Sequence, residues 1–148
     1  MLFSKIKKAV PHDSVWIMYS CEGSDPYFKK FISNKTIVPA VSFVTNNGIT
    51  LLVHSLDEDN IKNFSGKKVV YDGKEPLRKE INEILMSIDM PQNIYLNYSD
   101  NMDAVTDVLG HGIYKFLCDN IADFYQNNSR PVKFHSADTI MSKKQKKT

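Results

Sequence analysis

The residues that could perform chemistry are dispersed along the chain, and none of their spacings is typical of a catalytic or metal site. A metal site needs clustered His, Cys or carboxylate ligands. The four histidines show neither HxxxH nor HxxE spacing and lie far apart, at His12, His54, His111 and His135. The fold could still bring them together, but an isolated histidine is usually structural or solvent-exposed. The sequence therefore predicts no histidine-based metal site.

The two cysteines, Cys21 and Cys118, are equally isolated. A cysteine nucleophile needs a paired base, and neither residue lies in a recognisable nucleophile context. Cys118 lies within a predicted helix, beside Phe116 and Leu117. Two lone cysteines without CxxC spacing are typical of a reduced protein that forms no disulfide. We therefore expect a cytoplasmic location.

Two short stretches could bind ions. The three acids Asp57-Glu58-Asp59 could form a metal or acid/base cluster, but they also suit the positive end of a helix dipole, and no histidine accompanies them. The second stretch, residues 110–112, is Gly-His-Gly before a predicted helix, where free N–H groups could bind an anion. It follows another predicted helix, so a helix-to-helix corner is the simpler interpretation. We predict no catalytic, metal-binding or cofactor-binding residue in this chain.

The overall composition is that of one ordinary globular domain of 148 residues with a formal net charge of +2. Among the 19 basic residues only Arg78 and Arg130 are arginines, which argues against a nucleic-acid partner because arginine is preferred for phosphate recognition. No apolar run approaches the ~18 residues of a membrane span. We expect neither nucleic acid nor membrane as a partner.

A hairpin is the strongest structural signal in the chain. Two uncharged apolar runs, residues 40–45 and 49–54, flank Asn46-Asn47-Gly48, and Asn and Gly tolerate the positive φ of a tight turn. Strands that are apolar on both faces are usually central and covered on both sides. We therefore expect this hairpin in the middle of a sheet, under helices.

The remaining elements alternate around this hairpin. Ser24 or Asp25 can cap a helix that begins at Pro26, and Pro76 begins the clearest helix. Further strands are predicted at residues 14–20, 67–71, 93–97 and 132–134, and further helices at 2–10, 75–89, 102–109 and 111–125, shortly after residue 57 and from residue 136 onward. The predicted fold class is α/β, with a central mixed β-sheet of about five to six strands and helices on both faces.

Several stretches, in this order and spacing, resemble the N-terminal domain of the creatinase/prolidase family, which includes Xaa-Pro dipeptidases and aminopeptidase P. They are Asp25-Pro26 followed by Phe31, residues 41–54, 57–61, 94–99 and 107–114, Ser136-Ala137-Asp138-Thr139-Ile140, and Lys147-Thr148. One departure is Phe31-Ile32-Ser33-Asn34, where many members have Tyr-Leu-Thr-Gly. Asn34 can adopt the left-handed conformation that Gly provides.

The resemblance implies a ribonuclease H-like domain at residues 1–135 and the start of an interdomain linker helix at 136–148. It also implies that the catalytic domain is absent from this chain. In the family that domain binds two divalent metal ions (Mn, Co or Zn) through two Asp, one His and two Glu, and it cleaves the bond before proline. Partners would be the chain's own C-terminal catalytic domain and a second copy in a homodimer.

In this picture the chain is no enzyme on its own, while its parent is a metallopeptidase hydrolase. The domain would contribute to dimerisation and cover the active-site entrance, with the loop at residues 21–34 facing it. The candidate entrance-facing residues are Ser24, Asp25, Pro26 and Asn34. Three alternatives stay open: a peptide- or protein-binding module from an inactive member, the N-terminal domain of a creatinase-type amidinohydrolase, and a free-standing small enzyme.

Overall fold

The core of the fold is a mixed sheet of six strands in the order β4-β3-β2-β1-β5-β6. The computed structural model describes residues 2–22, 24–33, 36–61, 63–103 and 106–140, with only the backbone described for residues 2–4. Strand β2 pairs antiparallel with both neighbours, and every other pair in the sheet is parallel. The strands are β1 Ser14–Ser20, β2 Ala40–Val44, β3 Ile49–His54, β4 Lys67–Tyr71, β5 Asn93–Leu96 and β6 Lys133–Ser136.

The predicted hairpin is confirmed as β2 and β3, with Val44 opposite Ile49 and the amide of Thr45 donating to the Gly48 carbonyl over 2.9 Å. Every residue of β2 is buried, and so are the first five of β3. Continuous burial follows from the position of these strands, because helices cover both faces of the sheet there. The mixed α/β class is therefore also confirmed.

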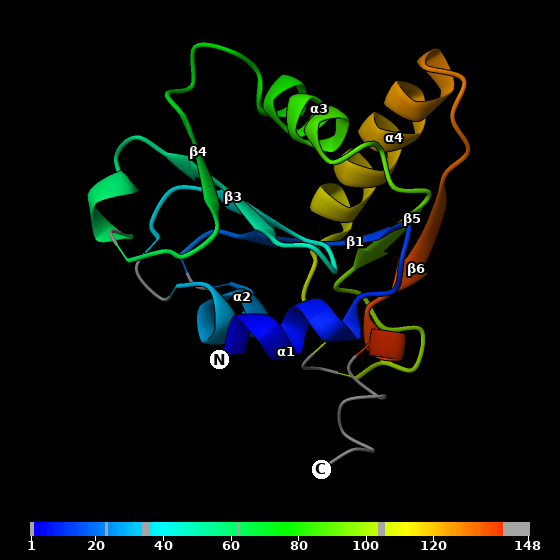
Figure 1. Cartoon of the computed structure of the whole chain (residues 1–148), viewed down its shortest axis with the longest axis horizontal. Helices are drawn as coiled ribbons and strands as arrows, with labels where there is room; N and C mark the ends of the chain where they lie inside the picture. Colours follow the sequence, from blue (N-terminus) through cyan, green and yellow to red (C-terminus); the bar gives the residue numbers. More distant parts are fainter. Residues whose placement is uncertain (1, 23, 34–35, 62, 104–105, 141–148) are drawn as a thin grey trace.

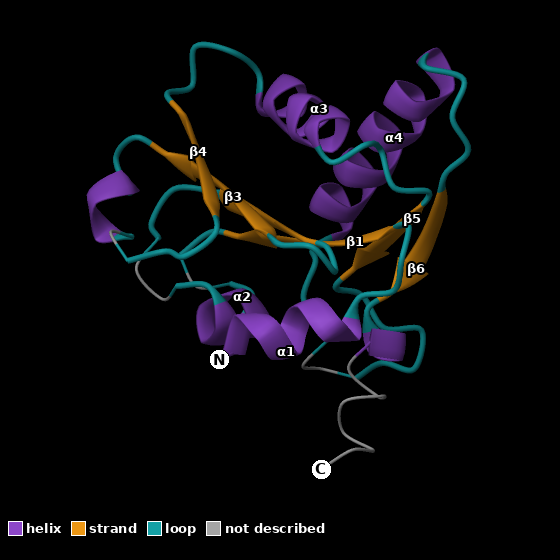
Figure 2. Ribbon diagram, in the orientation of Figure 1, coloured by secondary structure: helices purple, strands orange, loops and turns teal. Residues whose placement is uncertain are grey.

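Two helical layers enclose the sheet (Figures 1 and 2). Helices α1 (Leu2–Ala9) and α2 (Pro26–Phe31) cover one face, and α3 (Leu77–Ser87) and α4 (His111–Asn127) cover the other. Successive side chains of a strand point to opposite faces. In β1, Trp16 and Met18 therefore enter the core beneath α1 and α2, while Val15 and Ile17 enter the core beneath α3 and α4.

The predicted helix at residues 102–109 is wrong. In the described part of this segment, residues 102–103 and 106–109, the backbone forms turns and bends. The hydroxyl of Ser99 accepts bonds from the amides of Asn101 (3.2 Å) and Asp103 (3.1 Å), and Met102 has a φ of +58°. Side chains that bond nearby backbone amides compete with helix formation, so this segment is a loop.

Helix and strand ends also differ from the predictions. Helix α3 occupies Leu77–Ser87 within the predicted 75–89, since Asp89 and Met90 have positive φ angles of +64° and +45°. The last described strand is β6, Lys133–Ser136, which overlaps the predicted 132–134 and extends two residues beyond it. A helix begins at Asp138, whose amide donates to the Ser136 hydroxyl over 3.1 Å, as predicted for a Ser136 cap. The predicted tail and Lys147-Thr148 lie outside the described residues.

Candidate functional site

Three connecting segments meet where β1, β5 and β6 end. These strands are parallel, so their carboxyl ends lie at one edge of the sheet. The segments that follow them contain residues 20–28, 97–107 and 136–138. Ligands of open α/β sheets commonly bind outside the carboxyl ends of the strands. This edge, which includes the candidate entrance loop, is the natural place to look for function.

A buried polar network holds this edge together. The Trp16 indole N–H donates to Asn97 Oδ1 over 2.7 Å, and Asn97 Nδ2 donates to Asp25 Oδ2 over 2.6 Å. The other carboxylate oxygen of Asp25 accepts from the amides of Tyr27 (2.9 Å) and Phe28 (3.1 Å). Asp25, Trp16 and Asn97 are all at most 1% exposed. The carboxylate therefore both caps α2 and anchors it to the end of β5.

Burial raises the pKa of the Asp25 carboxyl above the ordinary aspartate value. The hydrogen bonds from Asn97, Phe28 and Tyr27 oppose this effect without cancelling it. The physical cause is the loss of hydration around a charged group that is nearly inaccessible to water.

We expect the Asp25 carboxyl carbon, followed by carbon-detected NMR, to titrate above the ordinary aspartate range. Because the folded-state pKa is raised, the folded chain binds this proton more tightly than the unfolded chain does. The contribution of Asp25 to stability should therefore be highest at low pH and fall as pH rises from the ordinary aspartate value through the folded-state pKa. A titration midpoint of Asp25 at or below the ordinary aspartate value would contradict this.

At the same edge, hydrogen bonds connect the loop after β5 to the start of the last described helix. The Ser99 hydroxyl donates to Asp138 Oδ2, and the Ser136 hydroxyl donates to the Tyr98 carbonyl. Tyr27 and Thr106 share a hydroxyl–hydroxyl contact of 3.4 Å. Burial is the main cause that raises the pKa of the Tyr27 hydroxyl. The three segments thus form one hydrogen-bonded unit.

A second pair of polar groups fixes the entry to β2. Asp57 is 1% exposed, and its Oδ2 accepts from the amides of Ile37 (2.9 Å) and Val38 (2.8 Å). The Tyr71 hydroxyl donates to the Pro39 carbonyl, and burial raises its pKa to about 12. Asp57 was predicted to act at a helix start, but it makes no cap bond to the short 3₁₀-helix η1 (Glu58–Asn60). Its role is to hold the preceding loop.

The candidate entrance residues do not all point the same way. Ser24 and Pro26 are exposed at this edge, whereas the Asp25 side chain points inward to Asn97. Asn34 lies outside the described residues. The sequence did not point to Asn97 and Trp16, which lie 72 and nine positions from Asp25. The one available signal was the position of Asn97, a side-chain amide directly after a buried strand. Asp25 therefore positions the loop, and Ser24 and Pro26 are the residues presented to solvent.

Three of the four histidines make local hydrogen-bond contacts, each with a different partner. His54 Nδ1 accepts from the Leu56 amide over 3.0 Å, His12 lies 2.8 Å from the Asn46 amide nitrogen, and His135 lies 2.9 Å from Asn93. Within the described ranges no group of three or more His, Cys, Asp or Glu could hold a metal ion. Gly110 precedes α4 without a side-chain cap, and it follows a loop, so the predicted helix-to-helix corner is wrong.

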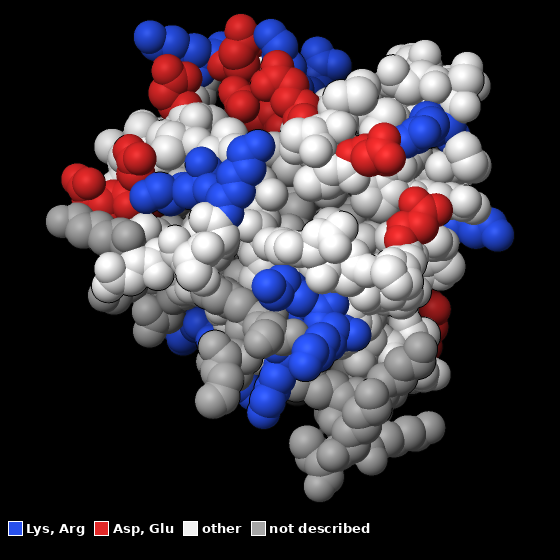
Figure 3. All heavy atoms as spheres, viewed as in Figure 1, with Lys and Arg blue, Asp and Glu red and all other residues white. Residues whose placement is uncertain are grey.

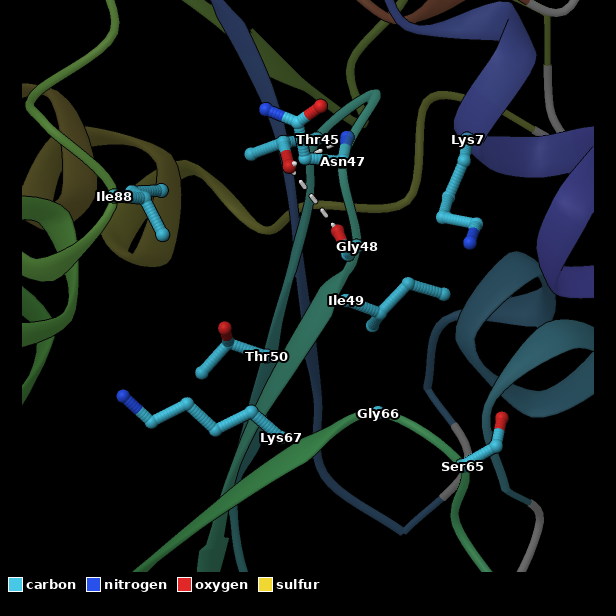
Figure 4. A pocket seen from close by; sticks show the side chains of 10 residues that line it. All are labelled: Lys7, Thr45, Asn47, Gly48, Ile49, Thr50, Ser65, Gly66, Lys67 and Ile88. Carbon is cyan, nitrogen blue, oxygen red and sulfur yellow. Dashed lines mark hydrogen bonds between the residues drawn. The ribbon is translucent and has the colours of Figure 1, made fainter.

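Two hollows lie at the opposite edge of the sheet, where the parallel strands begin. One has a volume of about 400 Å³ and is lined in part by the hairpin turn, with Lys7 and Lys67 around it (Figure 4). The other, of about 570 Å³, is lined in part by Asp13, Asp89 and Asn46. Neither contains any residue of the Asp25–Asn97–Trp16 network or a candidate entrance residue, so they are separate from the edge described above.

No family model matches the chain, and no curated protein matches it in sequence. Solved structures do match the chain, by similarity of fold. The X-Pro aminopeptidase from Thermotoga maritima superposes with a TM-score of 0.64 at 12% identity, covering 90% of this chain and 33% of that one. A dipeptidase from Pyrococcus horikoshii superposes with a TM-score of 0.63 at 16% identity, covering 98% of this chain and 36% of that one.

The deciding match is an isolated domain. The creatinase/prolidase N-terminal domain of an X-Pro dipeptidase from Streptococcus pyogenes gives a TM-score of 0.60 at 14% identity, covering 91% of this chain and 98% of that one. The fold is that of the creatinase/prolidase N-terminal domain. At these identities the likeness concerns the fold alone. The creatinase/prolidase-type domain described here spans about a third of the length of the longer peptidases, 33% and 36%.

None of the helices in the described part of this creatinase/prolidase-type domain is long and apolar enough to cross a bilayer.

Proposed function

We propose that this chain is the non-catalytic N-terminal domain of a metal-dependent Xaa-Pro peptidase, with a domain at residues 1–135 and, from residue 136, a linker segment whose helix begins at Asp138. One observation carries the proposal. The match to an isolated N-terminal domain covers 91% of this chain. The match to a longer peptidase covers 90% of this chain but only 33% of that peptidase. The helix that begins at Asp138 suits a link to a following catalytic domain.

The residues that the structure describes do not fit a bimetallic centre. Such a centre needs several converging carboxylates and a histidine, and the described residues contain no such group. The two buried aspartates, Asp25 and Asp57, each use their oxygens to accept backbone or amide N–H groups. Metal-assisted hydrolysis of an Xaa-Pro bond is therefore assigned to a separate domain of a cytoplasmic parent enzyme, and no step of it is assigned to this chain.

The contribution of this domain would be to pair two copies and to cover the entrance of an active site. The loop after β1 suits the second role because Ser24 and Pro26 are exposed while the loop is anchored beneath them by Asp25. An anchored loop with exposed small residues can limit the size of a substrate without adapting to it. Residues 21–34 are thus the proposed entrance cover, with Ser24 at its exposed part.

In a full-length protein that carries this chain at its N-terminus, Ser24→Trp should raise KM for Xaa-Pro peptides. We expect about a threefold or larger rise with kcat nearly unchanged, because the added bulk affects substrate access and not the chemical step. Gln126→Trp is the matched control, since Gln126 is also exposed but lies in the last turn of α4. Manganese-dependent hydrolysis of Xaa-Pro dipeptides and tripeptides would measure KM and kcat for both variants.

Equal KM values for Ser24→Trp and Gln126→Trp would remove the entrance role while leaving the peptidase proposal intact. A full-length protein without metal-dependent hydrolysis would instead favour a binding module from an inactive relative.

A further inference from the structure

Charge is divided unequally between the two helical layers of this domain. Helices α1 and α2 together contain five lysines and no acidic residue. Helices α3 and α4 contain both signs on the other face of the sheet. The lysines are Lys5, Lys7, Lys8, Lys29 and Lys30. A formal net charge of only +2 for the whole chain therefore conceals a strongly basic side.

Four of these lysines form what we call the lysine face: Lys5, Lys8, Lys29 and Lys30, all exposed. Their helices lie on the same side of the sheet, because Ile6 of α1 and Phe28 of α2 share one core. Blue side chains gather over α1 in the lower part of Figure 3 with no red between them. The lysine face thus comprises exposed lysines of two helices that cover the same side of the sheet.

The lysine face has no internal counter-charge. The ion pairs found among the described residues involve other basic side chains, namely Lys68, Lys74, Lys79 and Arg130. The Lys30 ammonium lies 5.4 Å from the centre of the Phe31 ring, which is a weaker interaction than an ion pair. Clustered charges of one sign create a potential that attracts an oppositely charged partner.

The chemistry of the face discriminates among anionic partners. Binding of single-stranded nucleic acid uses exposed aromatic rings for base stacking, but Tyr27, Phe28 and Phe31 of α2 are at most 7% exposed. Peripheral membrane helices insert apolar side chains, whereas Ile6, the described apolar side chain in the middle of α1, is 1% exposed. The face also lacks arginine, which is preferred for bidentate phosphate contacts.

We propose that the lysine face docks an acidic polypeptide surface, one rich in Asp and Glu. Lysine ammonium groups act as mobile point charges on flexible stems, so they can pair with carboxylates that are not held in a fixed planar geometry. Charge complementarity would supply orientation and a fast association rate more than high affinity. This inference does not depend on the peptidase proposal, because it concerns the α1–α2 side and not the entrance loop.

The test compares two quadruple variants with the same change in net charge. One is Lys5→Gln, Lys8→Gln, Lys29→Gln and Lys30→Gln. The control is Lys74→Gln, Lys79→Gln, Lys115→Gln and Lys133→Gln, four exposed lysines outside the lysine face. Glutamine is a good helix former, so the helices should be retained, and circular dichroism would check this. The probe is a fluorescent deca-glutamate peptide at low ionic strength, read by anisotropy.

We expect the lysine-face variant to lose about tenfold or more in affinity for deca-glutamate, and the control about twofold or less, because exposed ion pairs each contribute a fraction of a kcal/mol. Amide shifts in NMR should map to α1 and α2. Equal losses in the two variants, or no binding by the unsubstituted chain, would overturn the proposal. So would tighter, face-dependent binding of single-stranded DNA or of phosphatidylserine vesicles.

Discussion

Replacing Asn97 by leucine should lower the free energy of unfolding by about 3–5 kcal/mol, because it leaves the buried Trp16 indole N–H without its acceptor and removes one of the hydrogen bonds to the buried Asp25 carboxylate. The Asp25 carboxylate would lose a 2.6 Å bond, and the Trp16 indole N–H would lose its acceptor at 2.7 Å. Leucine has a similar volume, so the loss would come from hydrogen bonding and not from a cavity. Urea unfolding at neutral pH would measure it.

The matched control is Asn127→Leu at the exposed last residue of α4, where the change should stay within about 0.5 kcal/mol. The pH dependence adds a second criterion. Protonation of Asp25 removes the buried negative charge that has lost the hydrogen bond from Asn97, so the destabilisation by Asn97→Leu should shrink as the pH falls. A loss below about 1 kcal/mol at neutral pH would mean that the network contributes little to this edge.

Gly66→Ala should be destabilising by about 3 kcal/mol, at the upper end of what overpacking costs. A Cβ at this position would lie 2.3 Å from the Ile49 carbonyl oxygen and 2.8 Å and 2.9 Å from ring carbons of Phe64. The carbonyl belongs to the backbone of the central strand β3, which cannot move aside without disturbing the pairing of β3 with β4. Gly66 is therefore required by close approach of the chain, immediately before β4.

Gly112→Ala is also a glycine-to-alanine substitution, but here we expect the stability to rise. A Cβ there would meet no atom within 4 Å, and Gly112 is the second residue of α4. Alanine is the better helix former, so stability should rise by up to about 1 kcal/mol. Thermal or urea unfolding of the two variants side by side would separate steric exclusion from the general effect of removing a glycine. Changes of the same sign would contradict the packing around Gly66.

Local chemistry explains which parts of the fold were predictable from the sequence. The turn at Asn46-Asn47-Gly48 and the cap at Asp25 depend on residues that are near neighbours in the chain, and both are present. Residues 102–109, in the loop after β5, were predicted as a short helix. The competing bonds that the Ser99 hydroxyl accepts and the left-handed conformation of Met102 were not visible in the sequence.

The edge at the carboxyl ends of β1, β5 and β6 was harder to predict because the residues that bond there are distant in sequence. Asn97 is separated from Trp16 by 81 positions and from Asp25 by 72, so no local pattern connects them. The sequence alone placed Ser24, Asp25, Pro26 and Asn34 in one loop but could not tell that the Asp25 side chain turns inward. The lysines of α1 and α2 were visible individually, whereas their common face required the packing of Ile6 near Phe28.

We propose that this domain contributes shape and contacts to a peptidase but no catalytic metal. The most direct test is calorimetric titration of the purified chain with Mn²⁺, combined with a hydrolysis assay on Xaa-Pro dipeptides using the same sample. We predict no saturable binding of a metal pair and no metal-dependent cleavage. Two tightly bound ions per chain, accompanied by cleavage before proline, would contradict the account.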